Sequence, residues 1–282
     1  MLTAVDIINV LRQEELSIGA IGDVYVDVDS IVAGGSSVVA RCRIRGVEGD
    51  FLLKCLYDTG IPQRWCPCAL CVSYLNVATI SGRRQKMCCI LRHWVDGISL
   101  DRAIISGECD YTKFSILFDR MALEQLLSAE AHGDISPENI VVCGDRMRLI
   151  DNDAAWGPND KTQYALEYGT PSFTRPNREI QRPSKHMDDY SIALLSTLLA
   201  DLSHYAAGAM ASGDAQVAIP QEMIEGILSP THDTIACATR RLLDVGDMPH
   251  YALAKTLGGV LTHIPQLREI LEYITTHYHS LL

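Results

Sequence analysis

The patterning of apolar residues changes near residue 100 of this 282-residue chain. Before that point, runs such as "SSVVARCRIRG" (36–46) and "QKMCCILRHW" (85–94) combine strand-forming and polar residues in the way typical of antiparallel strands. After it, segments such as 111–132 and 188–206 repeat apolar residues at helical spacing. The sequence therefore predicts an α+β protein in which a small, antiparallel β-rich lobe precedes a larger helical lobe.

The expected boundaries follow from this change. We expect a β-rich N-lobe over 1–92, a connecting segment over 93–99 and a helical C-lobe over 100–282, together forming one domain. In the N-lobe the pattern predicts a helix over 3–15, a turn at "VEGD" (47–50) and strands over 24–33, 36–46, 51–57, 74–81 and 85–94. In the C-lobe it predicts one clear β-hairpin, within 132–153.

Composition excludes some classes of partner. The formal net charge of −11 and the pI near 5.2 argue against a nucleic-acid partner, which would favour a basic face. The N-terminus has no basic start followed by an apolar core, and no apolar stretch looks long enough to span a membrane. A cytoplasmic protein is therefore expected, with its ten cysteines as reduced thiols.

The segment "CPCALC" leaves an alternative open for some of these thiols. Cys66, Cys68 and Cys71 could contribute to a zinc site if Cys88 or Cys89 supplied the fourth ligand. The other interpretation is that they are small apolar side chains, because no second CxxC or paired histidine follows at a familiar spacing.

Residues able to bind a metal or a proton gather in "HGDISPENIVVCGDRMRLIDND" (132–153). Asp134 and Asn139 come just before the first strand of the expected hairpin, and Asp151 comes just after the second. Since an antiparallel pair brings those two ends together, we expect the three polar side chains to converge at one edge. His132 is expected to brace the hairpin.

This set of side chains suits phosphoryl transfer. Magnesium bridging nucleotide phosphates prefers hard oxygen ligands such as a carboxylate and an amide oxygen, which Asp151 and Asn139 would supply. A second carboxylate, Asp134, could accept a proton from an attacking hydroxyl or orient it.

At these residues the sequence resembles the protein kinase superfamily. "HGDISPEN" is similar to the catalytic loop H-R-D-L-x-x-x-N, and "DND" (151–153) stands at the place of the metal-binding D-F-G. "GTPSFTRPN" (169–177) is similar to the segment ending in A-P-E, and "DDYSIALL" (188–195) resembles the buried central helix. The resemblance implies a two-lobe kinase fold, ATP and Mg²⁺ as cofactors, and Asp188 as a brace for the catalytic loop.

The resemblance extends into the N-lobe. "FLLKCLY" (51–57) is similar to the strand that carries the phosphate-binding lysine, which makes Lys54 that lysine. "HWVDGISL" (93–100) resembles the hinge, where backbone groups near Trp94 and Val95 would meet adenine. Gly34, Gly35 and Ser36 lie where the glycine-rich loop would approach phosphate. These matches run in family order from about residue 30 to 200.

The chain also departs from the family pattern. The glycine-rich loop is reduced to "AGGSSVV" (33–39), and no glutamate lies between Glu48 and Glu108 to pair with Lys54. Gly133 replaces the arginine that reads a phosphate on the activation loop, and Ser136 replaces a lysine typical of serine/threonine kinases. The acceptor could therefore be a Ser/Thr or a Tyr hydroxyl.

The leading prediction is an ATP-dependent protein kinase acting on a protein substrate. Self-phosphorylation in the 154–170 loop, at Thr162, Tyr164 or Tyr168, is a further expectation. One alternative is a small-molecule phosphotransferase of the aminoglycoside or choline type, because those enzymes resemble this chain in H-G-D-x-x-x-x-N. Another is a pseudokinase that binds partners without catalysis, favoured by the reduced loop and the absent glutamate.

Overall fold

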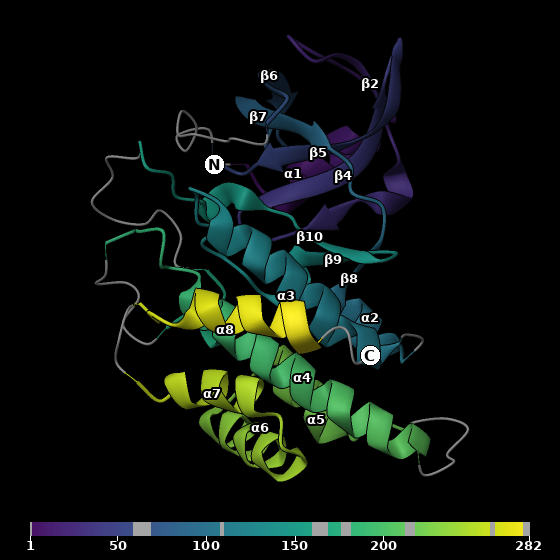
Figure 1. The fold of residues 1–282 in the computed structure, drawn as a ribbon. Helices are drawn as coiled ribbons and strands as arrows, with labels where there is room; N and C mark the ends of the chain where they lie inside the picture. The colour runs from purple at the N-terminus through teal and green to yellow at the C-terminus, as the bar shows by residue number, and fades with distance from the viewer. Residues whose placement is uncertain are drawn as a thin grey trace. The chain divides into compact units, whose positions relative to one another are not determined.

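The structure, a computed structural model, describes residues 2–58, 69–107, 110–159, 169–175, 182–211, 218–259 and 263–278. They belong to two compact units, Met1–Trp94 and Val95–Leu282, and each unit has its own apolar core. The first unit is built mainly of antiparallel strands and the second mainly of helices (Figure 1). The predicted α+β class, with strands first and helices after, is confirmed.

The N-terminal unit is a seven-stranded antiparallel sheet with one α-helix among its described residues. The strands run in the order β1-β2-β4-β5-β7-β6, and β3 pairs with β4. The elements are α1 (Ala4–Leu11), β1 (Glu15–Ile18), β2 (Gly22–Val26), η1 (Val28–Ser30), β3 (Val32–Ala33), β4 (Ser37–Ile44), β5 (Val47–Leu56), β6 (Cys71–Ala78) and β7 (Arg84–His93).

Local chemistry explains where these elements begin. Thr3 and Asp6 form a capping box that satisfies the first amides of α1, and the helix buries Ile7 and Leu11 against the sheet core. In β4 the inward positions include Val38 and Ala40, which are fully buried, in keeping with the two-residue period of a strand.

Three expectations for this unit were wrong. The strand predicted over 24–33 is interrupted, because η1 separates β2 from β3. The turn predicted at "VEGD" lies two residues earlier, at Arg45 and Gly46, because Ile44 pairs directly with Val47 and Gly46 adopts the positive φ of +77° that a two-residue hairpin loop needs. The helix predicted over 3–15 ends at Leu11, and Glu15 already pairs with β2.

The cysteines of the sheet pack as apolar side chains. Cys42, Cys55 and Cys89 lie in the main core of the unit, and burial together with the charge of Asp50 raises the pKa of the Cys42 thiol to about 12. The zinc alternative stays a prediction. Cys71 pairs with Leu91, so Cys89 and Cys88 lie two and three register positions away along β7. Cys66 and Cys68 lie outside the described residues.

The C-terminal unit is built around the long helix α4, which contacts α3, α5, α6 and α7. Its described elements are β8 (Ile98–Ser99), α2 (Leu100–Ser106), α3 (Tyr111–Leu127), η2 (Pro137–Asn139), β9 (Ile140–Cys143), β10 (Arg146–Leu149), η3 (Asn152–Ala154), η4 (Pro171–Phe173), α4 (Asp189–Ala211), α5 (Gln221–Leu228), α6 (His232–Val245), α7 (Met248–Thr256), α8 (Leu267–Tyr273) and η6 (Ile274–Tyr278).

The expectation that no stretch is long and apolar enough to span a membrane is corrected at helix α4. Among the described helices it alone is long and apolar enough to cross a bilayer by length and composition. Most of that apolar window, 72%, is buried inside the structure, as in the core helix of a folded unit. The apolar length of α4 is therefore used for packing against its neighbours.

Candidate functional site

The predicted hairpin is present in the C-terminal unit. Strands β9 and β10 are antiparallel, with Cys143 opposite Arg146, and Gly144 in the loop between them has φ +61°. The sequence missed a third strand, because β8 pairs with β9. At the open end of the hairpin the amide of Ile150 donates to the carbonyl of Asn139 at 2.9 Å. This pairing places Asn139 and Asp151 at the same edge, as expected.

Asp134 is held by two donors from different segments. Its Oδ1 accepts a hydrogen bond from the backbone N–H of Thr170 at 2.6 Å, and its Oδ2 accepts one from Asn139 Nδ2 at 2.9 Å. The side chain itself is half-buried. A carboxylate fixed from both sides and still reached by solvent is suited to orient a reacting group.

Asn139 is oriented by the same contacts. Its Nδ2 also donates to the backbone carbonyl of Asp134 at 3.0 Å, so the amide nitrogen faces the loop. The Oδ1 atom makes no hydrogen bond within the described part of the chain. A carbonyl oxygen held in this way, one residue along the hairpin edge from a carboxylate, fits a hard cation such as Mg²⁺.

Asp151 has an uncommon backbone conformation. Its φ of 60° and ψ of 64° lie in the left-handed region, and among the described non-glycine residues only Glu14 shares a positive φ. Asp tolerates this region better than most residues, yet such conformations have a cost and gather at functional sites. This conformation lies at the turn between β10 and η3.

The carboxylate of Asp188 holds the loop that carries Asp134 through hydrogen bonds to the loop backbone. The buried carboxylate of Asp188 accepts hydrogen bonds from the backbone N–H groups of His132 at 2.6 Å and Gly133 at 2.8 Å, and from Gln125 Nε2 at 3.2 Å. Burial raises the pKa of Asp188, while the charge of His132 and these hydrogen bonds act in the opposite direction. The contacts fix the backbone that presents Asp134.

The imidazole of His132 joins the loop to the hairpin. Its Nε2 lies 2.8 Å from the carbonyl oxygen of Ile150, and its Nδ1 lies 3.3 Å from the amide of Asp134. Since a carbonyl only accepts and an amide only donates, the proton of a neutral ring belongs on Nε2. His132 therefore links the loop before β9 to the residue that follows β10, and its role as a brace stays a prediction.

Two glycines make close approaches that sequence reasoning missed. Gly133 has φ +84°, and a Cβ there would clash with the backbone carbonyl of Ala154. Gly169 has φ +73°, and a Cβ there would lie 2.9 Å from the Gly133 oxygen and 3.0 Å from Asp134 Oδ1. Backbone packing therefore requires a glycine at 133, and the residue does more than replace the arginine of the family pattern.

The remaining predicted residues belong mostly to the N-terminal unit. Lys54 is 2% exposed on β5, opposite Val39 and Ile90. Gly34 opens a tight turn, with its N–H donating to the Ser37 carbonyl at 2.8 Å, and Ser36 accepts from the Tyr57 amide.

Trp94 and Val95 lie at the boundary of the two units. The N–H of Trp94 donates to the Asp50 carbonyl at 3.2 Å, and Val95 begins the second unit. Thr162, Tyr164 and Tyr168, the expected self-phosphorylation positions, lie outside the described residues.

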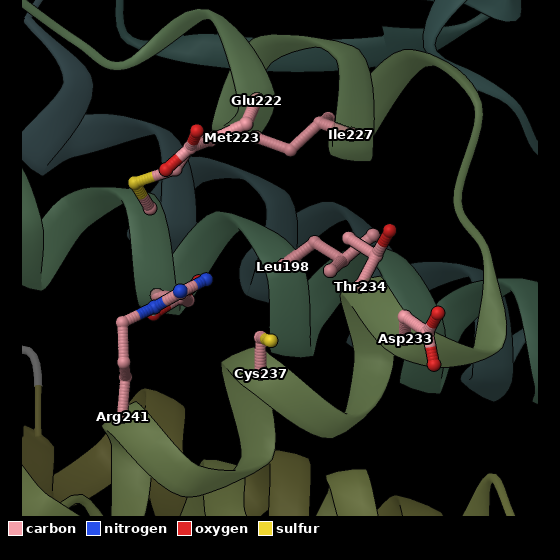
Figure 2. A pocket seen from close by; sticks show the side chains of 9 residues that line it. Leu198, Glu222, Met223, Ile227, Asp233, Thr234, Cys237 and Arg241 are labelled. Carbon is pink, nitrogen blue, oxygen red and sulfur yellow. The ribbon is translucent and has the colours of Figure 1, made fainter.

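A separate hollow of about 240 Å³ lies in the C-terminal unit, lined from α4, α5 and α6 (Figure 2). The guanidinium of Arg241, which lines the hollow, donates to the Asp201 carboxylate, with Nε to Oδ1 at 2.8 Å and Nη2 to Oδ2 at 2.5 Å. Cys237, on the same helix as Arg241, also lines it. None of the predicted site residues lines this hollow.

Comparison with known proteins adds no family. No family model matches the chain, and no curated protein matches it either.

Proposed function

We propose that the protein is an ATP-dependent protein kinase with the two-lobe fold of that superfamily, transferring the γ-phosphoryl group to a protein hydroxyl. The observation that carries the proposal is the fixation of Asp134 between the Thr170 amide and the Asn139 side chain. Thr170 belongs to the segment that resembles the peptide-docking region of kinases, so one carboxylate joins the catalytic loop to that segment.

In this proposal the C-terminal unit supplies the reacting groups. Asp134 orients the acceptor hydroxyl and receives its proton as the oxygen attacks the phosphorus. Asn139 and Asp151 would hold Mg²⁺, which when bound neutralises charge on the phosphate oxygens. His132 and Asp188 keep the loop in place through the backbone hydrogen bonds described above.

Most of the proposed nucleotide contacts come from the N-terminal unit. Lys54 would contact phosphate oxygens, and the turn at Gly34, Gly35 and Ser36 would approach phosphate with its backbone. Adenine would meet backbone groups at Trp94 and Val95. The Trp94 amide donates to the Asp50 carbonyl in the structure.

A second candidate is a small-molecule phosphotransferase, and Gly133 is the observation that favours it. Those enzymes resemble this chain in having glycine between the histidine and the aspartate of the loop. The packing of Gly133 against Ala154 leaves no room for the arginine of typical protein kinases. The acceptor would then be a small alcohol or amine, with Asp134 in the same role.

The test compares two substitutions that make the same chemical change in one region of the chain. Asp134→Asn should lower phosphate transfer from labelled Mg-ATP by roughly 100-fold or more, while nucleotide binding is retained. Asp145→Asn is the matched control, because its side chain is 93% exposed in the hairpin loop and lies 3.8 Å from Lys113. That variant should transfer phosphate at the wild-type rate.

The acceptor decides between the candidates. Phosphoamino-acid analysis of the protein itself and of generic protein substrates should show label on Ser, Thr or Tyr. Label that appears only on small alcohols or amines would replace the proposal by the second candidate. Binding of ATP without any transfer by the wild type would instead indicate a pseudokinase, and equal rates for both variants would remove Asp134 from the mechanism.

A further inference from the structure

Two histidines and an aspartate from distant parts of the C-terminal unit meet at the start of α4. The Nδ1 atom of His263 lies 2.9 Å from Oδ2 of Asp189, and Nδ1 of His186 lies 3.5 Å from the same oxygen. The two imidazole rings are in contact, with centroids 3.8 Å apart. One ligand atom from each residue lies within 4.8 Å of the other two.

We propose that His186, Asp189 and His263 form a binding site for a divalent transition metal of the zinc type. Two imidazole nitrogens and one carboxylate oxygen are a ligand set that suits Zn²⁺ better than Mg²⁺ or Ca²⁺. A tetrahedral zinc ion with bonds of about 2.0–2.1 Å separates neighbouring ligand atoms by about 3.3 Å. The two distances to Asp189 Oδ2 lie on either side of that value.

The surroundings orient the ligands. Asp189 is 1% exposed, and its Oδ2 also accepts the backbone N–H of Ile264 at 2.9 Å, which fixes the carboxylate. The side chains of His186 and His263 are 39% and 45% exposed, so an ion can reach the cluster from solvent. Three protein ligands leave the fourth position to water.

Binding has two chemical requirements. The Nδ1 atoms of His186 and His263 must be unprotonated, so each neutral ring carries its proton on Nε2. The metal would replace the hydrogen bond that His263 makes to Asp189. The buried guanidinium of Arg175 interacts electrostatically with Asp189 and reduces the attraction of the carboxylate for a cation.

An ion at this site would connect parts of the unit that are far apart in sequence. It would tie the segment before α8 to the first residue of α4, next to Asp188, whose carboxylate holds the loop amides of His132 and Gly133. We therefore expect the metal to stabilise the unit. This inference does not depend on the proposed phosphoryl transfer.

Zinc binding to metal-stripped protein tests the site directly. The wild type should bind one more Zn²⁺ per chain than His186→Ala or His263→Ala, or bind it roughly 100-fold or more tightly. His232→Ala is the matched control, because it removes an exposed imidazole at the start of α6 and should bind like the wild type. Zinc bound by thiols is common to all four proteins and cancels in the comparison.

Two further measurements test the site. Co²⁺ added to the wild type should give tetrahedral ligand-field bands without a thiolate charge-transfer band, and His186→Ala should lose them. Zn²⁺ should raise the melting temperature of the wild type and of His232→Ala but not of His186→Ala. Identical zinc stoichiometry, affinity and melting shift in His186→Ala and the wild type would overturn the site. If His263→Ala fails to fold, His186→Ala alone decides, because its contact with Asp189 is the longer one.

Discussion

Two clusters of polar side chains in the C-terminal unit differ in how many polar atoms they leave for a ligand. Around His250 the cluster is closed. Its imidazole lies between Asp247 Oδ2 at 2.8 Å and Asp119 Oδ2 at 3.1 Å, and the three residues are 3%, 1% and 0% exposed. The cluster at Asp134 and Asn139 is open, because both side chains are half-buried.

The partners in the closed cluster account for its burial. Asp119 Oδ1 accepts the Ser196 hydroxyl at 2.6 Å, and Asp247 Oδ2 also bonds His204 Nε2 at 2.7 Å. Through these contacts α3, α4 and α7 are joined by hydrogen bonds between side chains. Charges buried in this way are tolerated because they are paired.

In the open cluster one side chain atom is left for another molecule. Asn139 uses its amide nitrogen on Asp134, and its Oδ1 makes no hydrogen bond within the described part of the chain. The comparison teaches that residue type alone does not separate a structural cluster from a candidate site. What separates them is whether the polar atoms are already satisfied inside the fold.

The largest effect is expected from breaking the closed cluster. His250→Leu keeps a side chain of similar bulk but leaves Asp119 and Asp247 buried without the imidazole between them. We expect a loss of about 3–5 kcal/mol in the free energy of unfolding, measured in urea. His204→Leu is the control, because that imidazole is 36% exposed, and it should cost about 1 kcal/mol or less. Similar losses in the two variants would contradict the distinction between closed and exposed contacts.

A smaller effect is expected from pH. Burial alone would lower the pKa of His250, but the hydrogen bonds and charges of Asp119 and Asp247 raise it to about 9. Since this folded-state pKa lies above the ordinary value of 6.5, the stabilisation is complete below pH 6.5 and is lost as pH rises through 9. The free energy of unfolding should fall by on the order of 3 kcal/mol over that range.

Asp247 in the same cluster gives the opposite pH dependence, in which the free energy of unfolding falls as pH falls. Burial would raise the pKa of Asp247, but hydrogen bonds from His204 and His250 bring it well below its ordinary value of 3.8. Its contribution is present above pH 3.8 and is lost as pH falls further. Urea titrations at several pH values should show both slopes in the wild type. The alkaline slope should be absent in His250→Leu, and its persistence there would assign it to another group.

Sequence periodicity predicted the parts of the fold that depend on local pattern. The change from strands to helices and the β9–β10 hairpin follow from residue spacing and turn chemistry. The convergence of Asn139 and Asp151 follows from antiparallel pairing alone. The misplaced "VEGD" turn shows the limit of such reasoning, because both Gly46 and Gly49 adopt positive φ and composition does not tell which one forms the loop.

Contacts between distant residues were not predictable from one sequence. Thr170 follows Asp134 by 36 residues, and the Asp119–His250 contact spans 131 residues. No spacing rule links such pairs, because tertiary packing brings them together. In the sequence Gly133 is marked only by the arginine that it replaces, because its close approach to Ala154 depends on the fold of η3.

The close approach of Gly133 to Ala154 lies next to Asp134 of the open cluster and can be tested by substitution. Gly133→Ala should destabilise the protein by about 2 kcal/mol more than Gly144→Ala in urea unfolding, because a Cβ at 133 meets the Ala154 carbonyl. Gly144→Ala is the matched control, since φ there is also positive, at +61°, but a Cβ would have nothing within 4 Å. It should cost about 1 kcal/mol, the strain of the conformation alone. Equal costs would mean that the loop can move away from Ala154, and the position of Asp134 would then depend on Asp188 and Thr170 without support from backbone packing at 133.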